Sequence, residues 1–582
     1  MMPGSSKSPA TTSQDGETHD VRMERSLFSS IAIVATCTLG MITNISNAVS
    51  PSIAIPAIAR SLDIQQVQLE WIVSAYALSS GCLFLLCGRL ADLYGRKKAF
   101  ILGATWLLAF TIGCGFAQDS LTLDILRGLQ GVGVAALIPA SIGTLAHSFP
   151  LGQTRAIAFA TLSAGAPFGG AFGIAIGGVA TQLTKPSWRT TFFLNAAVTF
   201  LCIVGAFFFF DPDQPSTEVD RRVDWIGGFL VTVALVLIIF VLSQGEVAPN
   251  KWATPYIIAL LIVGVIVLLL FLFWQYHLER LQDRLPPSDD SFISRMSGKL
   301  ENLVWLPSPP PLMRVSLWSR AKGRVTVVLW IAFLNWCTFQ GWNYWVLLYY
   351  QNYIGFSPLR TLVRMLPMNV TGVICNIVFA ALIGHVPMVV LIVSGTCLTG
   401  CAALLFAVIN PNASFWAFGF PAAVLSVIGA DFVFATGTIF VAKVCQGHEQ
   451  SVGGALFQTM TQLGTSLGVT VSTVVFNRVL IKQTTDRGVV LGSNSPSTDA
   501  PREAQLDAYK AAQWTNFAFG MLATILGLIF LRHVGIIGRA EPIAMEDTER
   551  NSTILAEGDS ESIAEGKDRK GQSEKQGSVI QQ

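Results

Sequence analysis

The chain has 582 residues and a composition that excludes an ordinary water-soluble protein. Charged residues make up 13% of it and hydrophobic residues 52%, with a mean hydropathy of +0.54. A soluble globular chain carries about twice this charged fraction. The net charge of +2 and the scattered placement of Lys and Arg also argue against nucleic acid as a partner.

Apolar segments long enough to cross a bilayer recur along the chain, since a spanning helix needs roughly 20 residues. They lie near 28–55, 70–88, 99–117, 122–146, 156–180, 190–210, 225–243, 256–274, 325–350, 360–383, 386–409, 413–442, 453–480 and 514–536. The sequence therefore predicts an all-α membrane protein with 14 transmembrane helices, counted from these segments. An even count puts both tails on one side of the membrane.

Two amides stand out in the first span. Asn44 and Asn47 lie about one helical turn apart, so both can face the same cavity as hydrogen-bonding groups. Interhelical packing is the alternative role for this pair.

The loop between the second and third spans is short, basic and punctuated by glycine. Its cations place it in the cytoplasm by the positive-inside rule, and Asp92 is its one acid. A carboxylate among cations at a helix end can hold two spans together in one state and release them in another. The predicted conformational latch consists of Gly88, Arg89, Asp92, Gly95, Arg96 and Lys97.

The fourth and fifth spans carry further candidates. Arg127 lies inside an otherwise apolar span, where a charge is costly unless it faces a cavity or a partner such as Asp124. In the fifth span, glycines clear one helix face so that another helix can pack closely. The predicted packing residues are Gly169, Gly173, Gly177 and Gly178.

The spans divide into two six-helix bundles, 27–210 and 325–536, separated by two inserted spans within 211–274. Residues 275–324 are predicted to be a basic cytoplasmic loop, in which the proline-rich stretch 281–311 is a disordered linker without a role in transport. The polar tails 1–26 and 537–582 are predicted to be cytoplasmic.

Asp431 is the acid placed deep in a span of the second half. Burial penalises the charged form of a carboxylate, so Asp431 is a candidate for taking up and releasing a proton. Polar and aromatic residues recur at helical spacing on two second-half spans. The predicted substrate cavity is lined by Trp336, Gln340, Asn343, Gln458 and Gln462, together with the first-span amides.

The loop pattern G-x-x-x-D-x-x-G-R-K-K resembles the loop between the second and third helices of the major facilitator superfamily. The run from Arg127 to Ala136 resembles its fourth-helix motif R-x-x-Q-G-x-G-x-A-A, which implies a role for Arg127 in proton transfer. The span count resembles the fourteen-helix drug:proton antiporter branch. Within it, the chain resembles the fungal subgroup of aminotriazole and boron exporters and low-affinity ammonium transporters.

Two departures from these family patterns bear on coupling and direction. Asn47 stands where the branch has an acid, and an amide carries no proton. Ile174 stands where the antiporter motif of the fifth span has proline. Asp431 is therefore the expected substitute proton carrier.

These features predict a proton-coupled efflux transporter of small organic compounds: drugs, toxins or secondary metabolites. The alternatives are an importer or facilitator of a small polar solute such as ammonium or borate, and a transporter-like receptor. Enzymatic activity, a cofactor and a metal site are not expected. The expected partners are a small-molecule substrate, protons and the lipid bilayer of the plasma membrane or the vacuolar membrane, and a monomer is expected.

Overall fold

The computed structural model describes residues 26–62, 71–150, 152–181, 184–185, 187–213, 221–245, 248, 250–283, 309–356, 358–487, 500–532 and 534–536. Both predicted tails and most of the predicted linker, 284–308, lie outside the described residues. Fourteen helices in the described part are long and apolar enough to cross a membrane, which confirms the predicted number of spans.

The first bundle consists of α1 (Leu27–Leu62), α2 (Trp71–Tyr94), α3 (Arg96–Phe116), α4 (Ser120–Ser148), α5 (Gln153–Ala175, continued by the π-helix Ile176–Ala180) and α7 (Trp188–Phe209). The inserted helices are α8 (Trp225–Gln244) and α9 (Pro255–Asp283). The second bundle consists of α11 (Arg324–Leu348, continued by the π-helix Tyr349–Tyr353), α12 (Pro358–Leu382), α13 (Met388–Ala407), α14 (Gly419–Val444), α15 (Gln450–Asp486) and α16 (Arg502–Phe530).

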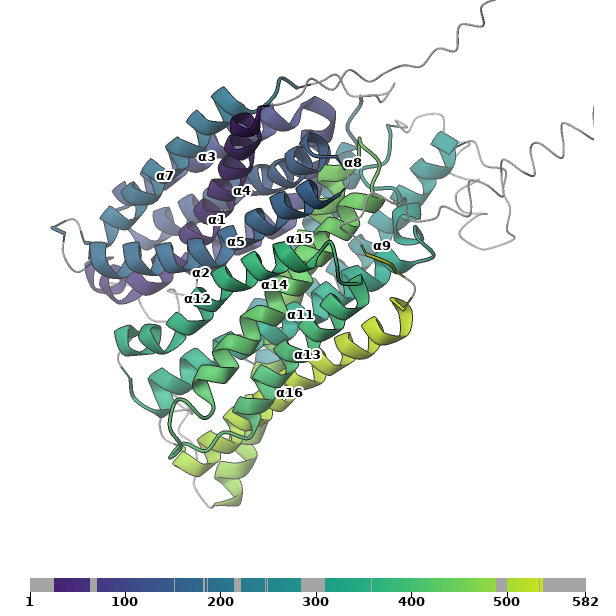
Figure 1. Ribbon diagram of the computed structural model, residues 1–582. Coiled ribbons are helices and arrows are strands. Elements are labelled where there is room, and N and C mark those ends of the chain that lie inside the picture. The colour runs from purple at the N-terminus through teal and green to yellow at the C-terminus, as the bar shows by residue number, and fades with distance from the viewer. Residues whose placement is uncertain are drawn as a thin grey trace, which may run out of the picture.

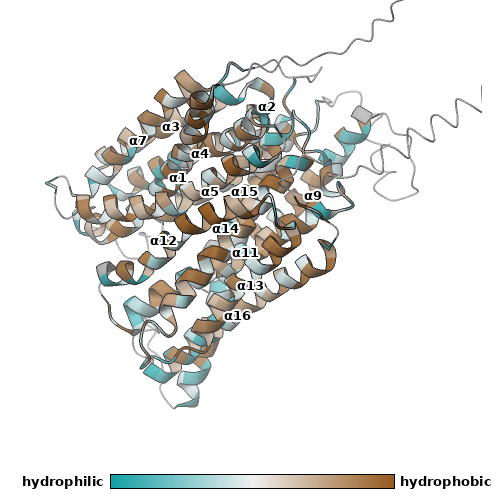
Figure 2. Ribbon diagram, in the orientation of Figure 1, coloured by the Kyte–Doolittle hydropathy of each residue, from teal (hydrophilic) through white to brown (hydrophobic). Residues whose placement is uncertain are grey.

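The two bundles lie side by side, purple to blue for the first and green to yellow for the second (Figure 1). Their contacts run between α2 and α15, α4 and α15, α5 and α12, and α5 and α14. The inserted helices pack on each other, and α8 also contacts α2 and α15. Hydrophobic residues dominate along the helices and hydrophilic ones gather toward their ends (Figure 2), as a bilayer requires.

Some helix bounds differ from the predicted ones. The segment 360–409 does form two helices, broken between Leu382 and Met388 as the Gly-His-Val-Pro sequence predicts. In contrast, α9 continues to Asp283, beyond the predicted end of the span at 274. A short 3-10 helix, Val315–Trp318, interrupts the predicted loop. The last turns of α9 are polar and do not raise the hydropathy, so a prediction from hydropathy ends this helix too early.

We call the end of the molecule where α2, α4, α7, α9, α12, α14 and α16 finish the inner end, because the positive-inside rule predicts that it faces the cytoplasm. The opposite end is the outer end.

Candidate functional site: an inner gate and buried polar groups

At the inner end, Asp92 reaches from α2 to the N-terminus of α15. Its Oδ2 accepts hydrogen bonds from the backbone N–H groups of Ser451 at 2.9 Å and Val452 at 3.0 Å. The first N–H groups of a helix have no intrahelical partner and carry the positive end of the helix dipole. An anion from one bundle thus caps a helix of the other.

Arg96 completes this contact. Its guanidinium bonds Asp92 Oδ1 through Nε at 3.0 Å and Nη2 at 2.8 Å, and Nη2 also donates to the Gly447 carbonyl at 2.6 Å. The side chain of Asp92 is fully buried, and Arg96 supplies the opposite charge that a buried carboxylate needs. Gly88 lies on the same seam, where a Cβ would meet Ala455 Cβ at 2.8 Å.

Other residues of the predicted latch stabilise the first bundle itself. Gly95 has φ 115°, which favours glycine, and a Cβ there would clash with the Asp213 carboxylate. Asp213 caps α3 by accepting from the Lys97 N–H at 2.8 Å, while Lys97 Nζ donates to the Phe210 carbonyl at the end of α7. Arg89 is buried beside residues 311–314 and also borders Glu449 and Val452 of the second bundle. Of the predicted latch, Gly95 and Lys97 therefore act within the first bundle.

Arg155 is a second crossing contact, at a residue that the sequence pattern did not single out. Its Nη2 donates to the Ala442 carbonyl at 2.9 Å, in the last turn of α14. A cation is favourable at a helix C-terminus, as an anion is at an N-terminus. The turn 442–452 between α14 and α15 is thus held by charges of the first bundle at both of its helix ends.

A buried polar network surrounds Arg127 within the first bundle. Nε donates to the Ile72 carbonyl at 2.7 Å, and Nη1 donates to the Asn47 carbonyl at 3.0 Å and to Gln130 Oε1 at 2.8 Å. Nη2 has no hydrogen-bond partner among the described residues, which exclude 63–70. The expected ion pair with Asp124 is absent from the structure, and Asp124 Oδ1 is also unpartnered. The reason is that Arg127 turns its donors toward carbonyl oxygens of α1 and α2.

The two first-span amides serve different contacts. Asn47 is fully buried, and its Oδ1 lies 3.4 Å from Gln130 Nε2. Asn44 is half-buried and accepts a hydrogen bond of 2.9 Å from the Tyr76 hydroxyl at Oδ1. Asn47 therefore belongs to the Arg127 network and Asn44 to the contact with α2.

The glycine face of α5 packs against α1 of the same bundle. A Cβ at Gly169 would meet the Ile42 carbonyl oxygen at 2.8 Å, one at Gly173 would meet Ser46 Cα at 3.1 Å, and one at Gly177 would meet the Ser50 carbonyl oxygen at 2.6 Å. Gly178 corrects the prediction, because a Cβ there would meet nothing within 4 Å. It directly follows Gly177 and so points away from the face that Gly169, Gly173 and Gly177 share at four-residue spacing.

Asp431 is buried in α14 and bonds to a residue that the sequence did not single out. Asn376 of α12 donates through Nδ2 to Asp431 Oδ2 at 2.7 Å and to the Gly372 carbonyl at 2.9 Å. Within the described part of the chain, Asp431 has no other hydrogen-bond partner and no ion-pair partner. Nearby, a Cβ on Gly372 would meet Pro167 of α5, so this region borders the first bundle.

The residues predicted to line the substrate cavity do not meet at one described pocket. Trp336 packs on Phe434, with ring centroids 5.5 Å apart, and Gln458 is buried. Gln340 and Asn343 are half-buried and make no hydrogen bond to another described residue. Gln462 lines a separate cavity of about 70 Å³ between α2, α8 and α15, bordered by Trp71, Ser74, Ala77, Leu78, Ile239, Phe240, Gln462, Thr465 and Ser466.

No group of three or more His, Cys, Asp or Glu side chains within the described ranges could hold a metal ion. All ten cysteines are free thiols in the structure.

The family model of the Major Facilitator Superfamily matches residues 33–245 and 223–469. The chain is 26% identical to "MFS-type transporter 1" of Pyricularia oryzae over 84% of this chain and 82% of that protein. It is 25% identical to a low affinity ammonium transporter of Saccharomyces cerevisiae, over 71% and 74% of the two chains. It is also 25% identical to efflux pump terJ of Aspergillus terreus, over 80% and 85%.

Among solved structures, the human organic anion transporter MFSD10 matches with a TM-score of 0.56 and 12% sequence identity. The match covers 86% of this chain and 99% of that one, and it supports the predicted fold class.

Proposed function

The chain belongs to the major facilitator superfamily, and on that premise we propose that it is a proton-coupled efflux transporter of small organic compounds. Transport would proceed by alternating access, in which the inner gate at Asp92 opens as the outer end closes. The similarity to an efflux pump supports the direction of transport. We place the protein as a monomer in the plasma membrane or the vacuolar membrane.

The observation that carries the proton-coupling proposal is the environment of Asp431. This carboxylate is 8% exposed and has a single neutral hydrogen-bond donor, Asn376, among the described residues. A buried carboxylate without a cation is costly when charged and acceptable when protonated. Binding a proton on one side of the membrane and losing it on the other would bias the two conformations. Arg127 has an amide, Asn47, in its network and no acid at that position. We propose that its positive charge assists proton coupling.

The test is concentrative transport in sealed vesicles with an imposed pH gradient, using ethidium as an organic-cation probe. Asp431→Asn resembles the protonated carboxyl permanently, so it should abolish ethidium accumulation while leaving ethidium binding and exchange intact. Asp119→Asn is the matched control, because Asp119 caps α4 outside the spans and asparagine also caps helices. A protonophore-sensitive ethidium gradient in Asp431→Asn would show that the proton travels by another residue.

A second candidate is a facilitator or importer of a small polar solute. The similarity to a low affinity ammonium transporter and the amide at Asn47 favour it. It predicts that ¹⁴C-methylammonium equilibrates across the vesicle membrane without a pH gradient, whereas the exporter requires the gradient. A transporter-like receptor would bind a probe and move none.

A further inference from the structure

Residues 309–320, between α9 and α11, are packed into the inner end of the molecule. Leu312, Met313 and Leu317 are at most 3% exposed and belong to the main hydrophobic core. The predicted linker 281–311 overlaps this segment at 309–311, where the three prolines are buried. Burial of these residues and of the three apolar side chains that follow indicates a fixed position for 309–320. We call residues 309–320 the clasp.

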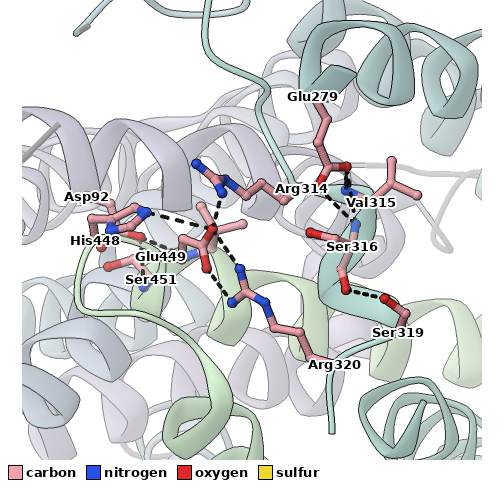
Figure 3. A network of polar contacts seen from close by, with 11 residues as sticks. Asp92, Glu279, Arg314, Val315, Ser316, Ser319, Arg320, His448, Glu449 and Ser451 are labelled. Carbon is pink, nitrogen blue, oxygen red and sulfur yellow. Dashed lines mark hydrogen bonds and ion pairs between the residues drawn. The ribbon is translucent and has the colours of Figure 1, made fainter. Parts of the chain in front are cut away.

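The clasp is attached to the inserted helix α9. Gln275 Oε1 accepts a hydrogen bond of 3.1 Å from the Met313 N–H. Glu279 Oε2 accepts from the N–H groups of Val315 at 2.8 Å and Ser316 at 3.2 Å, at the start of the short helix (Figure 3). Two side chains on one face of α9 therefore fix the backbone of the clasp.

The clasp is also attached to α15 at the residue that precedes the helix. Arg320 Nη1 bonds Glu449 Oε2 at 2.6 Å, and Arg314 Nε lies 3.5 Å from Glu449 Oε1. Glu449 occupies the N-cap position of α15 and is buried. Figure 3 shows Glu449 between these arginines on one side and the Asp92–Ser451 contact on the other.

Charge connects the contact between the clasp and Glu449 with the capping of α15 by Asp92. Asp92 and Glu449 are both acids at the N-terminus of α15, and two carboxylates near one helix end repel each other unless cations neutralise them. Arg96 binds Asp92, and the clasp supplies Arg314 and Arg320 for Glu449. Without the clasp arginines, Glu449 would lose two cationic neighbours and retain His448, whose Nε2 lies 3.8 Å from Oε1 and carries a charge only when protonated. The weaker compensation of its charge would weaken the capping of α15 by Asp92.

We propose that the clasp gives the inserted helices control of the inner gate: α9 positions residues 309–320, and their arginines neutralise Glu449 so that Asp92 can hold the gate closed. Arg320, Glu449 and Glu279 are thus positioning residues for gate closure. The inference rests on the proposed function only in that the inner gate opens during transport.

Cys445 is a native reporter for the test. It lies in the turn between α14 and α15, and burial raises the pKa of its thiol to about 12; Glu449 and Asp92 raise this pKa further, while Arg320 and Arg155 lower it. The labelling rate is therefore measured at several pH values, so that a change in the thiol pKa is separated from a change in exposure. A buried protonated thiol reacts slowly with maleimide, and opening of the gate would expose it. Its labelling in the purified protein, followed by mass spectrometry of the Cys445 peptide, needs neither substrate nor proton gradient. A failure of the clasp therefore remains distinguishable from a failure of proton coupling.

In Arg320→Met, we expect Cys445 to be labelled about fivefold faster than in the wild type, the factor that corresponds to losing roughly 1 kcal/mol of gate closure. Glu279→Leu should act in the same direction although it lies in α9, away from the gate. Arg487→Met is the matched control, because it breaks an ion pair with Glu503 at the outer end. It should leave the labelling rate unchanged.

A double-mutant cycle tests whether Arg320 acts through Glu449 or whether its loss destabilises the whole protein. Because Glu449→Gln removes the charge that Arg320 neutralises, adding Arg320→Met to it should change the labelling rate by less than twofold. Wild-type Cys445 labelling in both Arg320→Met and Glu279→Leu would overturn the proposal. So would full additivity in the cycle, since the two residues would then act independently.

Discussion

Asn376 and Asp431 join α12 to α14 through a hydrogen bond of 2.7 Å, in which the amide donates to the carboxylate. A donated hydrogen bond stabilises the charged form of a carboxylate relative to its protonated form. Asn376 is therefore placed to set the conditions under which Asp431 releases its proton. The titratable neighbour that interacts with Asp431 electrostatically is the Cys375 thiol on α12.

Asn376→Leu should shift the pH dependence of ethidium efflux to higher pH, since a proton on Asp431 would be retained where the wild type has lost it. The affinity for ethidium should stay within about twofold of wild type, because the change acts on the proton and not on the substrate. The measurement is the efflux rate across a pH series in vesicles. Asn369→Leu, which changes another buried amide of α12, is the control and should keep the wild-type profile.

Gly169 and Gly178 provide a matched pair on α5. Gly169→Ala places a methyl group 2.8 Å from the Ile42 carbonyl oxygen, so α1 and α5 must move apart. We expect a loss of about 1–3 kcal/mol in stability, seen as a lower thermal midpoint in detergent. Gly178→Ala meets open space and should unfold at the wild-type temperature. Equal midpoints for the two variants would contradict the packing of this face on α1.

The sequence predicted the features that depend on residue type along one helix. Fourteen apolar spans, the basic loop around Asp92 and the buried acid Asp431 are visible because hydropathy and charge stand out locally. The partners of these residues were not predictable in the same way. Asp92 binds two backbone N–H groups about 360 residues away, and any sequence supplies such groups at a helix start.

The same limit explains the residues that the sequence analysis missed. Arg155 binds a carbonyl oxygen of the opposite bundle, so its partner has no distinctive side chain. Asn376 is one of two amides in α12, and the crossing of α12 and α14 distinguishes it from Asn369. Gly178 directly follows Gly177, so it falls outside the face that the four-residue spacing of Gly169, Gly173 and Gly177 defines. For Arg155 and Asn376, the arrangement of helices decided what the sequence alone could not.

Asn47→Asp tests the environment of Arg127. The new carboxylate would lie beside Gln130 and within the network of a guanidinium whose Nη2 has no partner among the described residues. We expect an ion pair with Arg127 and a higher thermal midpoint in detergent, because a buried cation gains its counter-charge. Asn195→Asp is the control, since this buried amide of α7 bonds Ser46, Ser50 and the Thr191 carbonyl, and the same change there should lower the midpoint. A lower midpoint in Asn47→Asp would contradict the expected ion pair with Arg127.

The last prediction concerns the turn 442–452, which Asp92 and Arg155 hold at opposite helix ends. Asp92→Asn removes the anion at α15 and leaves Arg96 without its partner, and Arg155→Met removes the cation at α14. Each change should favour the inward-open state and raise Cys445 labelling, with the larger effect in Asp92→Asn because its carboxylate is fully buried and breaking a buried pair costs about 3–5 kcal/mol.

Because both side chains hold one rigid turn, releasing either end frees most of it. The double variant should therefore label only slightly faster than Asp92→Asn, with a non-additivity of about 0.5–3 kcal/mol, as found for residues that share a structural unit. Transport of ethidium should slow in both single variants while its binding persists. If the two effects added in full, each charge would close its own helix contact, and the turn would not act as one element of the gate.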